Sequence, residues 1–261
     1  MTREQGNGMR LRVLFDNNEL DGRLRTGWGF ACMVQGFGRT VLFDTGADGE
    51  VLLDNMRVLG VDPAAVDAVV LSHIHDDHTG GLDALMRVQR EIEVVVPPAF
   101  PPGFKRAVRE VGARLVEAGG PTPIGEGMTT LGQMGDAIAE QALALETPAG
   151  AVVITGCAHP GIAAIAERAA EQLQRPLALI IGGFHLFRSG PEDIESTAHR
   201  LSALPIERVA PCHCTGGPGR EALRRAFGDR FTPVGVGAEI DLAPPAGDDP
   251  SAAFRKTAAQ S

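Results

Sequence analysis

The sequence predicts a layered α/β protein, and three features of the chain support this class. Short apolar runs of strand length alternate with segments of helical spacing along most of the chain. Several of these runs end directly in glycine, histidine or cysteine, as strands do where loops gather at one edge of a sheet. The length of 261 residues fits one large α/β domain better than two, because folds of this class often run this long as a unit.

Apolar runs bounded by turn residues predict the strands. Val66–Leu71 is a continuous apolar run, typical of a strand buried on both faces, and it leads directly into a histidine-rich segment. Gln141–Glu146 and Ala151–Ile154 are joined by Thr-Pro-Ala-Gly, which predicts a hairpin. The other predicted strands are Leu11–Phe15, Ala31–Val34, Val41–Phe43, Glu93–Val96, Leu177–Ile181, Arg208–Ala210 and Gly235–Leu242.

Helical spacing of apolar residues predicts the segments between the strands. Helices are expected at Val51–Leu59, Leu82–Arg90, Lys105–Val111, Ile162–Gln172, Glu192–Ser202 and Arg220–Phe227. The segment Gly119–Gly135 is rich in glycine, proline and threonine, and its pattern indicates no definite element. One domain is expected over residues 1–243. Residues 244–261, rich in proline, alanine and aspartate, are expected to form a mobile tail.

Composition and charge narrow the classes of partner. The net charge of −9 argues against nucleic acid and against a membrane surface, because phosphate binding needs clustered lysine and arginine. A small-molecule substrate remains compatible, and a homo-oligomer stays open. No apolar stretch approaches the roughly 20 residues of a membrane span, and no secretory signal is visible, so a cytoplasmic location is expected. The cysteines are then expected to be reduced thiols.

Four predicted strands end near side chains that bind metals. These strand ends lie beside His73, Cys157, His185 and His213. Active sites of layered α/β proteins collect at one edge of the sheet, where the loops after the strands converge. The sequence therefore predicts one site built from all four strand ends.

The run His73-Ile74-His75-Asp76-Asp77-His78 is the strongest chemical signal in the chain. Imidazole nitrogen and carboxylate oxygen are the usual ligands of zinc and of similar divalent metals. In an extended or tightly turning segment, His73 and His75 point the same way, whereas Asp77 and His78 face a second metal beyond the turn. We predict one or two divalent ions, with zinc preferred and manganese or iron as alternatives.

These residues resemble the His-x-His-x-Asp-His signature of the metallo-β-lactamase superfamily, whose fold is an αββα four-layer sandwich. The segment that ends in Asp44-Thr45-Gly46 resembles the first motif of the same superfamily. That resemblance implies that Asp44 orients the metal-binding loop, and a carboxylate behind a ligand has this effect on imidazoles.

Further motifs are similar to one branch of the superfamily, the metal-dependent hydrolases, which includes the dihydropterin-ribofuranosylaminobenzene-phosphate synthase. The similarity covers roughly residues 11–242. Its motifs are Glu140-Gln141-Ala142-Leu143, Thr155-Gly156-Cys157-Ala158-His159-Pro160-Gly161, Gly182-Gly183-Phe184-His185-Leu186 and Pro211-Cys212-His213-Cys214-Thr215-Gly216.

The resemblance implies a ligand set. His213 matches the last histidine of the superfamily, a ligand of the second metal, and Cys157 stands where members have a bridging aspartate. His159 is then the candidate third ligand of the first metal, with Cys157 either a neighbour or a thiolate ligand. Neighbouring strand residues point to opposite faces, so Cys212 and Cys214 are expected to face away from His213 as inert thiols, in preference to a Cys-x-Cys metal site.

The remaining site residues have less definite roles. His185 is predicted to complete a metal shell, to bind a substrate phosphate or to act as a general acid, and Phe184 to line the pocket. Asp76 and Asp77 join His185 as candidate catalytic residues, with Asp76 or His185 as the proton relay. His199, on a predicted helix, is expected to face solvent.

The sequence favours a metal-dependent hydrolase that acts on a small ester, phosphoester or lactone through metal-activated water. The family resemblance implies an alternative, a transferase that joins a pterin methyl diphosphate to a ribofuranosylaminobenzene phosphate. For its phosphates the nearest cations are Lys105, Arg106 and Arg188. A non-catalytic metal-binding module is a third hypothesis, because a thiolate at Cys157 can trap metal.

Overall fold

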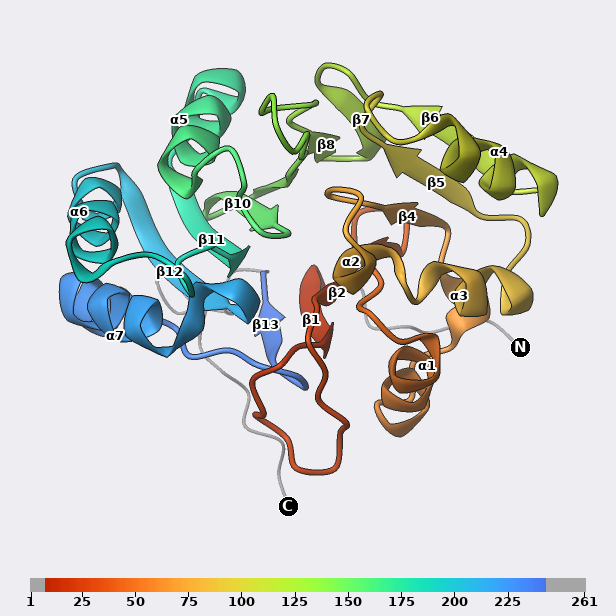
Figure 1. Cartoon of the computed structure of the whole chain (residues 1–261), viewed down its shortest axis with the longest axis horizontal. Coiled ribbons are helices and arrows are strands. Elements are labelled where there is room, and N and C mark those ends of the chain that lie inside the picture. Colours follow the sequence, from red (N-terminus) through yellow and green to blue (C-terminus); the bar gives the residue numbers. More distant parts are fainter. Residues whose placement is uncertain (1–7, 243–261) are drawn as a thin grey trace.

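Two β-sheets face each other, and helices cover the outer face of each (Figure 1). The computed structural model describes residues 8–242. The first sheet has the strand order β13-β1-β2-β3-β4-β5-β6 and the second β12-β11-β10-β9-β8-β7. In the described part of the chain, no helix is long and apolar enough to cross a membrane. The tail predicted at 244–261 lies outside the described residues.

The first sheet contains antiparallel and parallel pairs. Strands β13, β1, β2 and β3 pair antiparallel, and β3 to β6 pair parallel. The strands are β1 (Arg10–Phe15), β2 (Ala31–Gln35), β3 (Val41–Phe43), β4 (Ala68–Val70), β5 (Glu93–Val96), β6 (Arg114–Glu117) and β13 (Glu239–Asp241). Its helices are α1 (Gly49–Val58), α3 (Leu82–Val88) and α4 (Pro102–Glu110).

In the second sheet, β7 to β10 pair antiparallel and β10 to β12 pair parallel. The strands are β7 (Thr122–Gly125), β8 (Met128–Thr130), β9 (Leu143–Thr147), β10 (Gly150–Thr155), β11 (Leu177–Gly183) and β12 (Ile206–Cys212). Its helices are α5 (Ile162–Leu173), α6 (Pro191–Ser202) and α7 (Gly216–Phe227). The predicted hairpin is confirmed as β9–β10, with Gly150 opposite Thr147.

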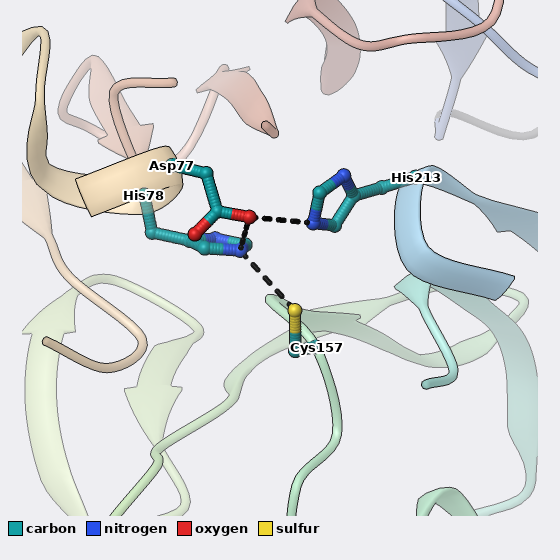
Figure 2. Close-up of side chains that lie close together, drawn as sticks. All are labelled: Asp77, His78, Cys157 and His213. Atoms are coloured by element: carbon teal, nitrogen blue, oxygen red, sulfur yellow. Dashed lines mark hydrogen bonds and ion pairs between the residues drawn. The ribbon is translucent and has the colours of Figure 1, made fainter. Parts of the chain in front are cut away.

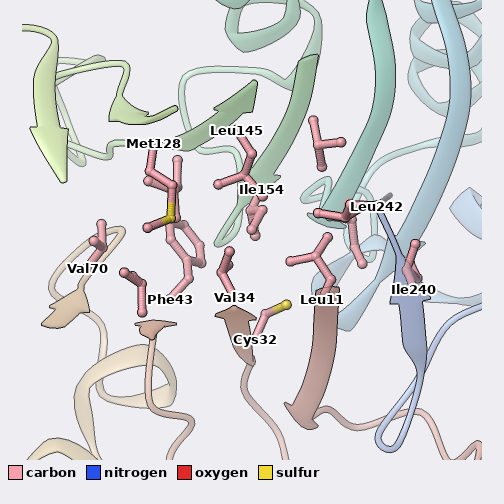
Figure 3. Packing of buried hydrophobic residues seen from close by; sticks show 14 of the residues in the cluster. Leu11, Cys32, Val34, Phe43, Val70, Met128, Leu145, Ile154, Ile240 and Leu242 are labelled. Atoms are coloured by element: carbon pink, nitrogen blue, oxygen red, sulfur yellow. The ribbon is translucent and has the colours of Figure 1, made fainter. Parts of the chain in front are cut away.

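Three hydrophobic clusters hold the layers together. The central cluster joins the inner faces of the two sheets: Leu11, Val34 and Phe43 from the first sheet meet Leu145 and Ile154 from the second (Figure 3). A second cluster lies between the second sheet and α5, α6 and α7, and a third between the first sheet and its helices. Both sheets are therefore covered on both faces, which explains why most strands read as continuous apolar runs. The predicted αββα four-layer fold is confirmed.

The structure adds elements that the sequence pattern did not indicate. Strand β6 was not predicted, because its four residues are only partly buried or exposed and it forms the edge of its sheet. The segment Gly119–Gly135 contains the β7–β8 hairpin, and the predicted strand Gly235–Leu242 is reduced to β13. The histidine run itself contains a one-turn helix, α2 (Asp76–Thr79).

Candidate metal centre

The predicted convergence of strand ends is present in the fold. Strands β10, β11 and β12 are parallel neighbours, with Thr155 paired to Gly182 and Gly183 to Cys212. Their carboxyl ends therefore lie side by side, and the loops that follow carry Cys157, His185 and His213. The loop after β4 in the first sheet carries the histidine run to the same place, because side chains of this run lie close to His159, Cys157 and His213.

The first group consists of His73, His75 and His159, whose candidate ligand atoms all lie within 4.8 Å of one another. His73 Nε2 is 3.1 Å from His75 Nδ1. The ring of His159 lies 4.7 Å from that of His73 and 5.0 Å from that of His75, measured between centroids. Three imidazoles from two distant loops thus face one point, which is the arrangement that binds a divalent metal.

The second group consists of Asp77, His78, Cys157 and His213, again with ligand atoms within 4.8 Å of one another. In Figure 2 the four side chains point toward one another: Asp77 and His78 come from α2, Cys157 from the turn after β10 and His213 from the turn after β12. Asp77 Oδ2 lies 3.3 Å from His213 Nε2 and 3.7 Å from His78 Nε2, and Cys157 Sγ lies 3.3 Å from His78 Nε2. Helix α2 separates the two groups, because the chain turns between His75, at its N-cap, and Asp77.

Asp44 connects the loop of the histidine run to the first sheet. It is fully buried and follows β3 with a left-handed φ of 57°. Its Oδ1 accepts a bond of 2.6 Å from the Ser72 backbone N–H, and Oδ2 accepts one of 2.7 Å from the Ser72 hydroxyl. Oδ2 also lies 2.7 Å from His78 Nδ1. A proton on that Nδ1 leaves the lone pair of Nε2 directed at the second group, as expected for a carboxylate behind a ligand.

Glu140 holds the turn that carries Cys157 and His159, a role that the sequence pattern did not reveal. Its buried carboxylate accepts the backbone N–H groups of Cys157, Ala158 and His159 at 2.9, 2.8 and 2.8 Å. Ala158 has a left-handed φ of 60°, so the turn is strained and needs these bonds to persist. The sequence signal was its place in the motif Glu140-Gln141-Ala142-Leu143, which resembles the family but does not indicate what the carboxylate binds.

His213 is held by residues that follow β1, far away in the sequence. His213 Nδ1 lies 2.9 Å from Asn17 Oδ1, and the His213 backbone N–H donates to Asp16 Oδ2 at 3.3 Å. Asp16 is fully buried, and burial raises the pKa of its carboxyl. Asp16 and Asn17 were not predicted, because nothing in the local sequence links them to a histidine near the other end of the chain.

At His73, His159 and Asp77 the electrostatics favour the protonation states that metal binding requires. Burial, reinforced by the nearby His78, holds the pKa of His73 well below its usual value, and burial and His185 lower the pKa of His159 to about 4. Burial acts to raise the pKa of Asp77, but the hydrogen bond to His213 and the charges of His78 and His213 outweigh it and bring the pKa to about 2. At neutral pH these imidazoles are neutral and Asp77 is charged.

Two buried nitrogen atoms fit a metal better than any protein partner. His159 Nε2 and His213 Nε2 are both buried, and neither makes a well-aligned hydrogen bond among the described residues; the nearest acceptor to His213 Nε2 is Asp77 Oδ2, at 3.3 Å. A buried polar atom without a partner is costly unless a ligand satisfies it. One of these atoms belongs to each group of side chains, so both groups fit a bound cation.

The cysteines are unpaired, as predicted, but the expectation that Cys214 faces away from the site is wrong. Strand β12 ends at Cys212, and His213 has a left-handed φ of 45° in the turn His213–Thr215. Alternation therefore stops, and Cys214 Sγ points back to the Cys157 carbonyl at 3.7 Å. Of Cys212 and Cys214, only Cys212 faces away from the site, where it contacts Asp16.

The aromatic lining of the site also differs from the expectation. Phe184 is 2 % exposed and lies in the cluster beneath α5, α6 and α7, so it has almost no surface for a substrate. Instead, the Phe187 ring lies 5.2 Å from the Trp28 ring and is tilted against it by 56°, and the Trp28 ring lies 5.0 Å from the His213 ring. Trp28 is 46 % exposed. Asp76, His185 and, as predicted, His199 are exposed.

The two facing sheets, with a histidine-rich loop where their edges meet, define the metallo-β-lactamase fold. The chain belongs to the metallo-β-lactamase superfamily, whose family model matches residues 29–213. The superfamily consists of metal-dependent enzymes, and the fold implies binding of a divalent metal, for which the two groups of side chains described above are candidate ligands.

Individual relatives agree with this assignment. The chain is 28% identical over 251 residues to the 7,8-dihydropterin-6-methyl-4-(beta-D-ribofuranosyl)-aminobenzene-5'-phosphate synthase of Methanocaldococcus jannaschii, covering 78% of this chain and 85% of the relative. A crystal structure of a metal-dependent hydrolase of the beta-lactamase superfamily is 30% identical, with a TM-score of 0.75 over 90% of this chain and 99% of the other. The chain shares its fold with the metallo-beta-lactamase fold protein YhfI from Bacillus subtilis. The two are 15% identical, with a TM-score of 0.66 over 90% of this chain and 99% of the other.

Proposed function

We propose that the protein is a metal-dependent hydrolase that acts on a small ester, phosphoester or lactone. The observation that carries the proposal is the pair of adjacent ligand groups, each with one buried imidazole nitrogen that makes no well-aligned hydrogen bond. The exposed His75 and His185 mark the side from which a small substrate reaches both groups.

Each of the two ligand groups binds one metal ion. His73, His75 and His159 hold the first ion, and Asp77, His78 and His213 hold the second, with Cys157 as a further thiolate ligand. When bound, zinc or a similar ion polarises the substrate oxygen and brings the pKa of a water molecule from about 16 to about 7. Asp44 orients His78, Asn17 orients His213, and Asp76, exposed beside the first group, carries protons to and from solvent.

Removal of metal tests this proposal. Treatment with a chelator is expected to abolish hydrolysis, and His75→Ala is expected to bind less metal at the first group, because it deletes one of three imidazoles. Metal content by mass spectrometry and turnover of a panel of esters, phosphodiesters and lactones are the measurements. His199→Ala, which changes an exposed histidine on α6, is the control and keeps both. Full activity of the metal-free chain would contradict the proposal that hydrolysis depends on a metal.

A synthase-type transferase is the second candidate, and the pair formed by the exposed Trp28 and the partly buried Phe187 favours it. Trp28 and Phe187 form a surface beside His213 on which a planar ring can stack. Of the three cations considered for phosphate binding, Lys105 pairs with Glu117 and Arg106 with Glu110. Arg188 alone lies at the aromatic pair, 5.1 Å from the Phe187 ring. In this reaction the metals would stabilise the departing diphosphate.

Substitution of Trp28 separates the two candidates. Trp28→Ala is expected to raise the KM for a pterin methyl diphosphate about 5-fold, because stacking on one ring contributes roughly 1 kcal/mol, and to leave hydrolysis of a small aliphatic ester unchanged. Trp28→Phe, which retains a ring, is the matched control and keeps most of the affinity. Absence of any condensed product with the pterin diphosphate and the aminobenzene phosphate together would rule out the transferase.

A further inference from the structure

A third group of candidate metal ligands lies beside the two already described. It consists of Cys157, His185 and Cys214, whose sulfur and nitrogen atoms all lie within 4.8 Å of one another. Each residue comes from a different loop, after β10, β11 and β12 respectively. Because these strands are adjacent and parallel, the three loops meet at one edge of the second sheet.

The backbone around this group is shaped to bring the side chains together. A Cβ atom at Gly183 would lie 2.6 Å from Cys214 Sγ and 2.4 Å from the Gly156 carbonyl, so only glycine leaves room for the Cys214 thiol. His185 has a left-handed φ of 52°, and His213, which precedes Cys214, has one of 45°. Strained non-glycine residues of this kind persist where the surroundings hold them, and they cluster at functional sites.

The chemistry of the group differs from that of its neighbours. Two sulfur atoms and one imidazole form a softer ligand set than three imidazoles or a set with a carboxylate, and such sets select zinc and other thiophilic ions. The two thiols are buried, whereas His185 is exposed. An ion held here would have three protein ligands and one side open to solvent, which is the arrangement of sites that keep an exchangeable position.

We propose that Cys157, His185 and Cys214 bind a further thiophilic divalent metal next to the second ligand group, with Cys157 shared between them. Cys157 suits this role because its Sγ also lies 3.3 Å from His78 Nε2 of the second group. Binding releases the proton of each thiol to solvent, and the metal takes the place of both protons. Of the roles open to His185, its position beside two thiols assigns it that of a ligand.

Cobalt binding by the full chain tests the proposal. The protein is stripped with a chelator, kept reduced with a phosphine and titrated with Co²⁺, while bound cobalt per chain and the thiolate-to-cobalt charge-transfer absorption are recorded. Cys214→Ser is expected to bind one ion fewer than the wild type and to lose part of the thiolate absorption. His185→Ala is expected to lose the same ion.

Cys212→Ser is the matched control, because Cys212 lies two residues from Cys214 but contacts Asp16 instead of Cys157; it is expected to match the wild type in both readouts. His185 is exposed, so His185→Ala decides the question if the buried Cys214→Ser does not fold. Equal cobalt content and equal absorption in wild type and His185→Ala would overturn the proposal. The readouts measure binding and not turnover, so they are independent of whether the enzyme hydrolyses or condenses its substrate.

Discussion

Asp77→Asn is expected to empty the second ligand group and to remove the activity that depends on it. Asp77 is the one carboxylate in that group, and its Oδ2 lies within 3.3 Å of His213 Nε2 and 3.7 Å of His78 Nε2. The asparagine side chain has the same size but no charge, and it places an uncharged amide where the cation binds. The loss of metal affinity should exceed the roughly 10–100-fold that follows removal of a residue that only orients a ligand.

The structure indicates that this substitution spares the fold. The side chain of Asp77 is half-buried. The Phe30 backbone N–H donates a hydrogen bond to the backbone carbonyl of Asp77, and asparagine retains this carbonyl. Asp76→Asn is the matched control, because it changes the exposed neighbouring carboxylate and keeps the metal content. Metal content after gel filtration, with turnover measured on the same sample, checks both variants. Full occupancy of the second group in Asp77→Asn would refute the assigned role.

The parts of the site that follow directly from the sequence are those encoded over short distances. The run from His73 to His78 needs only a strand followed by a turn to direct its side chains at two points. The strand ends near Cys157 and His213 could likewise be placed, since parallel strands end at a common edge. The resemblance to the metallo-β-lactamase superfamily then supplied the layer order, which the structure confirms.

The parts that the sequence did not reveal depend on contacts between distant segments. Asn17 supports His213 across 196 positions of sequence, and neither residue has a local pattern that points to the other. Cys214 was placed on the wrong face because the alternation rule assumes a continuing strand, whereas the left-handed His213 ends β12 and turns the thiol inward. Phe184 was assigned to the pocket from its position next to His185, but its ring is buried in the hydrophobic cluster between the second sheet and helices α5, α6 and α7.

Glu140→Ala is expected to destabilise the protein and to weaken the first ligand group at the same time. The substitution leaves the N–H groups of Cys157, Ala158 and His159 without their acceptor. Each buried N–H without a partner costs about 1–3 kcal/mol, so the free energy of unfolding should fall by roughly 3 kcal/mol or more. The turn also carries His159, whose release removes one imidazole of the first group.

Glu140→Gln distinguishes loss of these bonds from loss of charge. Burial raises the pKa of Glu140, which means that the ionised carboxylate is held at a cost that its three donors offset only in part. The amide removes that charge and keeps one oxygen, which can still accept from Cys157 and Ala158, while its NH₂ group faces the His159 N–H. The loss of stability should therefore be smaller than in Glu140→Ala, but metal binding at His159 should still weaken.

Denaturant unfolding of the metal-free chain, together with zinc titration, measures the two effects separately. Glu146→Gln is the matched control, because Glu146 is an exposed glutamate on β9 whose partner is the surface residue Arg175. A surface substitution of this kind changes stability by no more than about 0.5 kcal/mol. If Glu140→Ala unfolds at the same denaturant concentration as Glu146→Gln and binds zinc as tightly, the carboxylate is not what holds the turn. The strained Ala158 would then depend on the packing of its own side chain, which is 2 % exposed, in the cluster beneath α5.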